Sequence, residues 1–513
     1  MRASAGQVPR WFHNGFLIVT GAFLYLDLFI LPATPIAGTD LDQSIYLHNA
    51  TKMFDGQMIY RDFFQFTPPG TELVYLVLFK LFGIHAWIPN AALVVLGLSL
   101  TWLSIFISKQ ILSGQAAYLP AFLFLALAFH PAMDGSHHWF SMLAVTAAIA
   151  LMIKDRNLAR VAEAGVLCAV ASFFTQPRGA GAVVGLAIFL WWEHRRKPEP
   201  DEPLWKSEAI LAATFTVATA VLNIYFLWNA GLKRFLWCTV IFGIKYYPAE
   251  SKLNSLQAYL AFPPMVAHLR HVPQPGWLLI HALLPLVYLL FFARCWRESK
   301  KSPDQPWDRL MLVSSVGFFL FLGVAPAPIF WRLFVVSLPG LIVLAWFLDS
   351  PGKLLVLARR VLWIGTAAAM VSIVWNHQTR WRAILETPTG RAAFFEPDEY
   401  QRYKWLASRT HPPELFFDCS GKSYFLLGLR SPAKVSFLSG TDYLRPEQVL
   451  DLTENLERHR VPVILWCSDL DAAIRPDDHL GPLRDYLRTH YHATGPPDNS
   501  LVFLERNAWS LMK

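Results

Sequence analysis

The sequence predicts a polytopic α-helical membrane protein with a small α/β domain at its C-terminal end. Of its 513 residues, 54% are hydrophobic and only 16% are charged, whereas about a quarter of the residues of a soluble domain are charged. Long apolar runs recur through residues 1–375. After about residue 376 the hydropathy falls, and short apolar runs alternate with helical patterns. We therefore expect a membrane module over 1–375 and a second domain over 376–513.

A membrane-spanning helix needs about 17 to 25 predominantly apolar residues. By this rule we expect about eleven spans, at 15–34, 87–108, 115–130, 138–153, 161–176, 179–193, 208–229, 277–294, 310–325, 328–348 and 354–375. Lys and Arg gather in every second connection, and the short connections HPAMDGSHH and APAP have neither. Because cytoplasmic loops are rich in Lys and Arg, this alternation predicts a cytoplasmic N-terminus and an extracytoplasmic C-terminal domain.

The net charge of +8 falls mostly in these short loops. It therefore carries information about orientation and does not indicate a nucleic-acid surface. We expect membrane lipid, and no nucleic acid, among the partners. The five Cys show no spacing typical of a metal site.

The first long connection, residues 35–86, is too polar to span a membrane and too apolar to be a plain loop. Apolar positions recur at helical spacing in SIYLHNATKMF, and TELVYLVLFKLFG is an apolar helix about half a span long. Pro68, Pro69 and Gly70 break the chain between them. We predict two helices that lie along the outer membrane–water interface.

The C-terminal domain shows alternating strand and helix patterns. We expect helices at 396–408, 446–459 and 480–490, and strands at PELFFDC, AKVSFL, VPVILWC and SLVFLE. This alternation predicts a mostly parallel sheet. Cys419 and Cys467 each end a predicted strand. They either pair in an oxidising compartment or remain buried thiols.

The residues that follow the first span carry a motif. Asp40 and Asp42 come first, then DGQMIYRDFF and PPG, then an apolar half-helix that ends in LFG. This arrangement resembles the GT-C class of membrane glycosyltransferases, nearest to the bacterial branch related to protein O-mannosyltransferases and lipid A aminoarabinose transferases. The resemblance covers the first loop, the count and orientation of the spans and, in outline, the outer domain. It implies transfer of a sugar from a polyprenyl-phosphate donor to an acceptor hydroxyl of a lipid, glycan or protein, on the extracytoplasmic face of the inner membrane.

This chemistry explains an acid at the mouth of the first span. Inverting transfer needs one carboxylate that takes the proton from the attacking hydroxyl. By the resemblance, we expect Asp42 to be the catalytic base, with Asp40 as the second candidate. Relatives typically read Asp-Glu-Gly where this chain has Asp42-Gln43-Ser44, and Gln43 cannot take a proton.

A phosphate leaving group needs cations, because negative charge develops on it. Three cations lie on the predicted outer side of the membrane module: Arg178, Lys245 and Arg332. We predict that they bind the donor phosphate, because a charge at membrane depth is costly unless it is paired or faces water. The alternative for each is that its side chain only reaches lipid headgroups.

Further residues are expected to bind substrate. Tyr246 and Tyr247 follow Lys245 and would flank the sugar, and Arg61 lies in the first-loop motif. His137 and His138, in the turn MDGSHHW, would hold the acceptor or orient the acid; the alternative is a polar turn that caps the next span. No cofactor is certain, and a divalent metal ion stays open at this turn because His and Asp both ligate such ions.

The function that we predict is therefore that of an inverting glycosyltransferase with a lipid-linked donor. A polytopic transporter or flippase of a lipid-linked glycan is the alternative, since many spans with charged residues also suit transport. Against it, the sequence shows no internal repeat. A non-catalytic glycan-assembly protein is the third reading, which Gln43 favours.

Overall fold

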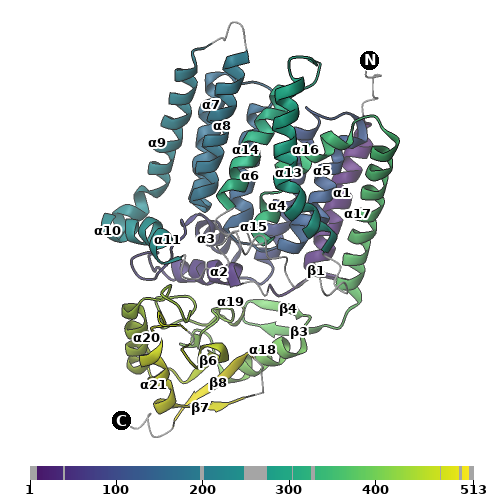
Figure 1. Ribbon diagram of the computed structural model, residues 1–513. Coiled ribbons are helices and arrows are strands. Elements are labelled where there is room, and N and C mark those ends of the chain that lie inside the picture. Colours follow the sequence, from purple (N-terminus) through teal and green to yellow (C-terminus); the bar gives the residue numbers. More distant parts are fainter. Residues whose placement is uncertain are drawn as a thin grey trace.

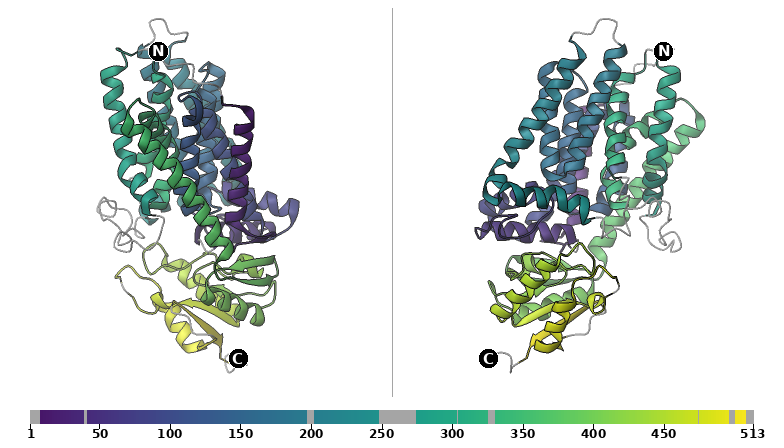
Figure 2. Two further views of the ribbon diagram at one scale, coloured as in Figure 1. Left: turned by 90° about the vertical axis from the view of Figure 1, so that its right-hand side faces the viewer. Right: turned by 60° about the vertical axis from the view of Figure 1, so that its left-hand side comes forward.

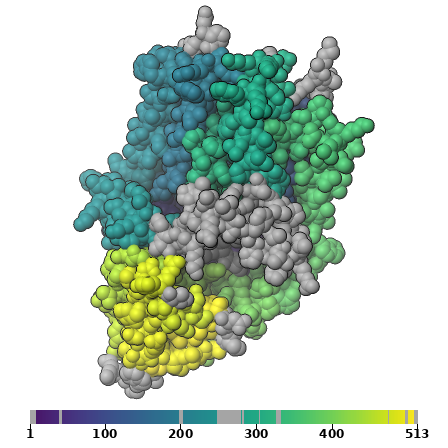
Figure 3. Space-filling model, in the orientation of Figure 1, coloured from purple at the N-terminus to yellow at the C-terminus, as the bar shows by residue number. Residues whose placement is uncertain are grey.

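The computed structural model describes residues 8–38, 41–196, 202–247, 274–302, 304–324, 330–473, 475–495 and 500–507. A bundle of long helices forms one part of the molecule, and a smaller domain of helices and strands closes one end of it (Figure 1). The space-filling view shows that this outer domain sits directly against the end of the bundle (Figure 3).

In the described residues, each predicted span contains a helix or consecutive helical segments, but the helix of the first predicted span, 15–34, ends at Leu28, because residues 29–30 and 34–35 form two short paired strands. The bundle contains α1 (Arg10–Leu28), α4 (Ile88–Ser108), η1 (Gly114–Tyr118), α5 (Leu119–Phe124), η2 (Leu125–Phe129), η3 (His130–Ala132), α6 (His137–Met152), α7 (Leu158–Phe174), α8 (Gln176–Arg196), α9 (Leu204–Ala230), α13 (Gln274–Glu298), α14 (Trp307–Val324), α15 (Phe330–Val335), α16 (Leu338–Leu348) and α17 (Lys353–Thr379). Among the described residues, five helical segments are both long and apolar enough to cross a membrane. The total of about eleven spans stays a prediction.

Two of these helices present apolar faces to the surroundings. Only 11% of the most apolar window of α9, and 11% of that of α17, is buried. Val217, Val221 and Ile224 of α9 are exposed, as are Val361 and Ile364 of α17. Exposed apolar faces of this length need an apolar solvent, which a bilayer provides.

The two ends of the bundle are distinguished by the outer domain, which lies at one of them (Figure 1). The N-terminal ends of α1 and α17 lie away from the outer domain (Figure 1), and α17 leads from there into the outer domain (Figure 2). The orientation in a membrane remains a prediction from the charges.

Shorter elements lie across the end of the bundle that faces the outer domain (Figure 1). They are α2 (Leu41–Phe54) and α3 (Gly70–Phe82) of the first loop, and α10 (Leu232–Leu236), η4 (Trp237–Ile241) and α11 (Phe242–Lys245) after α9. The predicted break is confirmed, since α3 begins at Gly70. Strands β1 (Phe29–Ile30) and β2 (Thr34–Pro35) pair just after α1.

The outer domain begins with the hairpin of β3 (Ala383–Thr387) and β4 (Gly390–Phe394). Its main sheet has the order β5-β6-β8-β7, formed by β5 (Phe417–Asp418), β6 (Val463–Cys467), β8 (Leu501–Arg506) and β7 (Tyr491–Thr494). The helices are α18 (Pro397–Arg409), α19 (Tyr424–Leu427), α20 (Pro446–Arg458) and α21 (Gly481–His490), with the 3-10 turn η7 (Ser468–Leu470) after β6.

Two details of the predicted sheet are wrong. Among the described residues of this sheet, only β5 and β6 are parallel, whereas β6 pairs with β8, and β7 with β8, in antiparallel fashion. The connection from β7 to β8 is too short for the crossover that parallel strands need. The segment AKVSFL is not a strand, because it packs on the first loop: the backbone carbonyl of Lys434 accepts a hydrogen bond from the Phe64 backbone N–H at 2.8 Å.

The neighbouring ends of β5 and β6 bring Cys419 and Cys467 together. Their Cα atoms lie 5.8 Å apart, and the two residues form a disulfide across 48 positions of sequence. Of the two alternatives, the structure therefore contains the disulfide and not two buried thiols.

We expect Cys419→Ser/Cys467→Ser to destabilise the outer domain by about 4 kcal/mol, the chain-entropy value for a closed loop of this length. The measurement is thermal unfolding of the purified protein with and without a reductant. Reductant should lower the transition of the natural chain and leave the double variant unchanged. An equal response of both proteins would contradict the prediction.

Buried polar residues join the outer domain to the first loop. Glu72 of α3 accepts hydrogen bonds from Gln65 at 3.0 Å and from Asn49 at 3.3 Å, and Asn49 accepts one from Ser436 of the outer domain at 3.0 Å. Burial raises the pKa of Glu72 to about 7. Nearby, burial lowers the pKa of Lys52 to about 7, and its ammonium group donates to the carbonyl of Ala433 at 3.3 Å.

Glu72 makes folding dependent on pH. Its pKa in the folded protein is raised from 4.5 to about 7. The free energy of unfolding is therefore highest below pH 4.5 and falls by about 3 kcal/mol as the pH rises to 7. We expect Glu72→Gln to remove this loss, and thermal unfolding at pH 4.5 and pH 7 measures it. Lys52 adds its own dependence only above this range. Glu396→Gln, at an exposed site, is the matched control, and an unaltered pH dependence in Glu72→Gln would count against this role.

Candidate active site

A cavity of about 990 Å³ lies where the bundle, the first loop and the outer domain meet. Its walls include residues 130–134 and 175–178 of the bundle, 64–67 of the first loop, 239–240 near α11, and 435–437 of the outer domain. A cavity of this size suits a small substrate.

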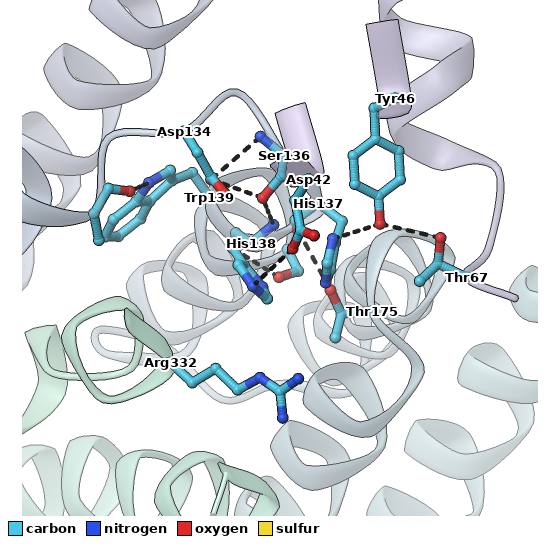
Figure 4. Close-up of polar contacts among 12 residues, drawn as sticks. Asp42, Tyr46, Thr67, Asp134, Ser136, His137, His138, Trp139, Thr175 and Arg332 are labelled. Carbon is cyan, nitrogen blue, oxygen red and sulfur yellow. Dashed lines mark hydrogen bonds and ion pairs between the residues drawn. The ribbon is translucent and has the colours of Figure 1, made fainter. Parts of the chain in front are cut away.

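Asp42 enters the cavity from the first turn of α2. Its side chain is 47% exposed, and its Oδ2 lies 4.0 Å from Nε2 of His138. His138 belongs to the first turn of α6, where the preceding Ser136 caps the helix by accepting a hydrogen bond from the His138 backbone N–H. The close-up shows the carboxylate turned toward this imidazole (Figure 4).

Arg178 determines which nitrogen of His138 carries hydrogen. A guanidinium can only donate, and Arg178 donates to Nδ1 of His138 at 2.8 Å, to the His138 carbonyl at 2.9 Å and to the Ser141 hydroxyl at 2.8 Å. Nδ1 therefore accepts, and the imidazole hydrogen lies on Nε2, which faces Asp42. The helix cap that the alternative interpretation of this turn predicted is therefore present, and His138 also faces Asp42.

The neighbouring His137 is held by the first loop. Its Nδ1 lies 2.6 Å from the hydroxyl of Tyr46, which in turn lies 3.1 Å from the hydroxyl of Thr67. The amide oxygen of Gln43 accepts the backbone N–H of Gly135 at 2.6 Å. Gln43 thus fastens α2 to the turn before α6, a role that needs an amide or carboxylate oxygen and no proton transfer.

Arg332 of α15 supplies a second cation to the cavity. It donates to the hydroxyl of Tyr247, and its side chain extends toward the imidazoles of His137 and His138 (Figure 4). Tyr247 in turn stacks on Phe66 of the first loop with ring centroids 5.0 Å apart. The carboxylate of Asp42, the imidazoles of His137 and His138 and the guanidinium groups of Arg178 and Arg332 therefore line the same cavity.

No family model matches the chain, and no curated protein matches it significantly. Solved structures match over nearly its whole length. ArnT from Cupriavidus metallidurans bound to undecaprenyl phosphate is 14% identical, with a TM-score of 0.61 over 97% of this chain and 98% of that chain. The Archaeoglobus fulgidus oligosaccharyltransferase AglB, in complex with an inhibitory peptide and a dolichol-phosphate, is 10% identical, with a TM-score of 0.50 over 98% of this chain and 75% of that chain. Both are GT-C glycosyltransferases.

The chain has the GT-C fold. The resemblance seen in the first-loop motif is confirmed at the level of the fold. At these identities the likeness does not assign a reaction, so the roles of individual residues depend on the geometry of the cavity.

The GT-C fold brings together six of the predicted site residues, which line the cavity: Asp42, His137, His138, Arg178, Tyr247 and Arg332. Of the other four, Arg61, Lys245 and Tyr246 do not line it in the described part of the chain. Arg61 is exposed and pairs with Asp62 at 2.8 Å. Lys245 is also exposed, and its ammonium group lies 5.1 Å from the ring centroid of Tyr246. Asp40 lies outside the described residues.

Sequence reasoning missed a second polar group that lines the same cavity: Asp27, His130 and His377. An acid inside a predicted span is by itself a functional signal, so Asp27 was detectable. The two histidines were not, because they lie 103 and 350 positions away from Asp27.

A metal ion at the first group meets one obstacle. Ligand atoms of Asp42, His137 and His138 lie within 4.8 Å of one another. A metal-bound imidazole normally donates from its other nitrogen to an acceptor, whereas Nδ1 of His138 faces the guanidinium of Arg178 at 2.8 Å. If Nε2 were to bind a metal, Nδ1–H would point at another donor. The residues therefore do not fit a divalent ion held through His138.

We accordingly expect sugar transfer to persist in the presence of EDTA, within about twofold of the untreated rate, because His138 lacks the acceptor that a bound metal requires at Nδ1. The measurement compares initial rates before and after chelation and after addition of Mn²⁺ or Mg²⁺. Activity that disappears with EDTA and returns with either ion would overturn this assignment.

Proposed function

We propose that this protein is an inverting glycosyltransferase that moves a sugar from a polyprenyl-phosphate donor to a hydroxyl of a lipid, glycan or protein. The observation that carries the proposal is that Asp42 and Arg332, an exposed carboxylate and a guanidinium, line one cavity of a GT-C fold. The undecaprenyl phosphate of the ArnT structure and the dolichol-phosphate of the AglB structure support a polyprenyl phosphate as the donor carrier.

In this mechanism Asp42 is the general base. Its carboxylate takes the proton of the acceptor hydroxyl while the hydroxyl oxygen forms a bond to the anomeric carbon. The bond from that carbon to the phosphate oxygen breaks on the opposite face of the sugar, and its electron pair leaves with the phosphate. His138 Nε2–H faces the carboxylate and helps to orient it.

The leaving phosphate gains negative charge, so it needs donors in a partly dry site. Arg332 supplies a guanidinium that, among the described residues, donates one hydrogen bond, to Tyr247. Arg178 is more fully committed to His138 and Ser141, so its first role is to position His138. We place the reaction on the extracytoplasmic face of the inner membrane, where the charge pattern puts the outer domain.

The test uses the purified protein in lipid vesicles with a panel of undecaprenyl-phosphate sugars and membrane extracts as acceptors. Transfer of labelled sugar, with inversion at the anomeric carbon, is the expected result. Passage of a lipid-linked glycan across the bilayer without transfer would instead identify a flippase. Neither transfer nor passage, with sugar lipids bound, would indicate an assembly protein.

A further inference from the structure

The group of Asp27, His130 and His377 lies outside the machinery described above but lines the same cavity. Asp27 is on α1, His130 on η3 and His377 on α17. The Asp27 side chain is fully buried, whereas those of His130 and His377 are 21% and 19% exposed. A buried carboxylate is retained only when donors compensate its lost hydration.

Both imidazoles turn Nδ1 toward Asp27. Nδ1 of His130 lies 2.8 Å from Oδ2 of Asp27. Nδ1 of His377 lies 2.9 Å from the backbone oxygen of Asp27 and 2.9 Å from its Oδ1. Carbonyl and carboxylate oxygens accept, so each Nδ1 carries the hydrogen. In the neutral imidazoles, Nε2 is then left as an acceptor.

Within the part of the chain that the structure describes, no hydrogen bond uses Nε2 of His130 or of His377. The two rings lie close together, with centroids 5.7 Å apart, and each is partly open to the cavity. The cavity thus has donors where Arg178 and Arg332 lie, and a pair of acceptors beside Asp27.

We propose that His130 and His377, positioned by Asp27, form the acceptor subsite of the enzyme, where their Nε2 atoms accept hydrogen bonds from neighbouring hydroxyl groups of a polyol. This inference rests on the proposed function, because it assigns the part of the cavity beside Asp27 to the acceptor and the part beside the arginines to the donor. A phosphate is repelled by acceptors backed by a buried carboxylate and is attracted by the guanidinium groups. A diol instead matches the two imidazoles, because its two hydroxyl groups donate hydrogen bonds that the two Nε2 atoms accept.

A purely structural role is the competing explanation, since α17 must be anchored to α1. That anchor is already provided by Gln378, whose amide donates to the carbonyls of Leu26 and Phe29 at 2.8 and 2.7 Å. A structural clamp would use only the Nδ1 atoms of the histidines. The subsite needs the Nε2 atoms, and this difference makes the two roles separable.

The experiment uses diethyl pyrocarbonate, which acylates unprotonated imidazole nitrogens, on the full chain in detergent, with peptide mapping by mass spectrometry. Methyl β-D-glucopyranoside is the polyol probe, and inorganic phosphate is the comparison. We expect the glucoside, at twice its dissociation constant, to slow acylation of His130 and His377 about threefold. The exposed His85 should react at an unchanged rate. No protection by the glucoside, or protection by phosphate alone, would overturn the proposal.

A variant separates the subsite from the clamp. His130→Asn keeps an N–H donor near the position of Nδ1 and removes Nε2. We expect it to retain the thermal stability and undecaprenyl-phosphate binding of the natural chain. The glucoside concentration needed for half-maximal protection of His377 should rise about three- to tenfold, the effect of one lost neutral hydrogen bond on the dissociation constant. Undiminished protection in a folded His130→Asn would leave only the clamp.

The two proposals fail separately. Acylation needs no turnover, so glucoside protection without any sugar transfer would refute the glycosyltransferase and keep a polyol site. Transfer that Asp42→Asn abolishes, with no protection at His130 or His377, would keep the enzyme and refute the subsite. His85→Asn is the matched control for His130→Asn, since it lies outside the cavity lining.

Discussion

Asp42→Asn lowers kcat for sugar transfer by about 10²- to 10⁴-fold, the range contributed by a general base. Asn has the shape of Asp but cannot take the acceptor's proton. The side chain is 47% exposed, so the exchange leaves folding intact. Initial rates of transfer in vesicles measure the effect, and donor binding should stay within about threefold, since a base acts on the acceptor.

The matched control is Asp485→Asn, the same exchange at a 79% exposed site of the outer domain. We expect full activity from it. If Asp42→Asn were as active as this control, Asp42 would not be the base, and the same exchange at Asp40 would be the next variant to measure.

Arg332→Gln lowers kcat/KM for the donor by about 10²- to 10³-fold, as expected for removal of one charged donor to a developing anion. Gln keeps a polar group near Tyr247 but has no charge to offer a phosphate. Arg332→Lys should recover part of the loss, because an ammonium keeps the charge without the planar fork of a guanidinium. Kinetics with the donor as the varied substrate measure all three proteins.

Binding assays distinguish a charge contact between Arg332 and the phosphate from a role of Arg332 in the packing of the cavity. Undecaprenyl phosphate should bind Arg332→Gln more weakly, while undecaprenol, which has no phosphate, should bind both proteins equally. Arg391→Gln, at a 58% exposed site, is the control. Equal loss of both lipids would mean that Arg332 supports the shape of the cavity and does not contact the phosphate.

Local sequence was sufficient for the helices. Each predicted span contains helix in its described residues, although α1 ends at Leu28, six residues before the predicted end of the first span. The helix α3 begins at the predicted break, and Asp42 lies at the start of α2 in the cavity. The strands were predicted less well than the helices, since AKVSFL has the composition of a strand but packs on the first loop. Local sequence also did not show which side chains face the cavity. Lys245 and Arg61 each lie in a suitable motif, yet each is exposed and outside the cavity lining.

The sequence by itself determined the helical membrane class, the positions of most helices and one acid that lines the cavity. These depend on local apolar runs, because a backbone in lipid must satisfy its own hydrogen bonds within each segment. Only the tertiary structure decided which polar groups share the cavity. Asp27, His130 and His377 come from three distant segments, and Arg178 donates a hydrogen bond to a histidine 40 positions away. Contacts between residues so distant in sequence depend on how the helices pack against one another, and no local sequence pattern predicts them.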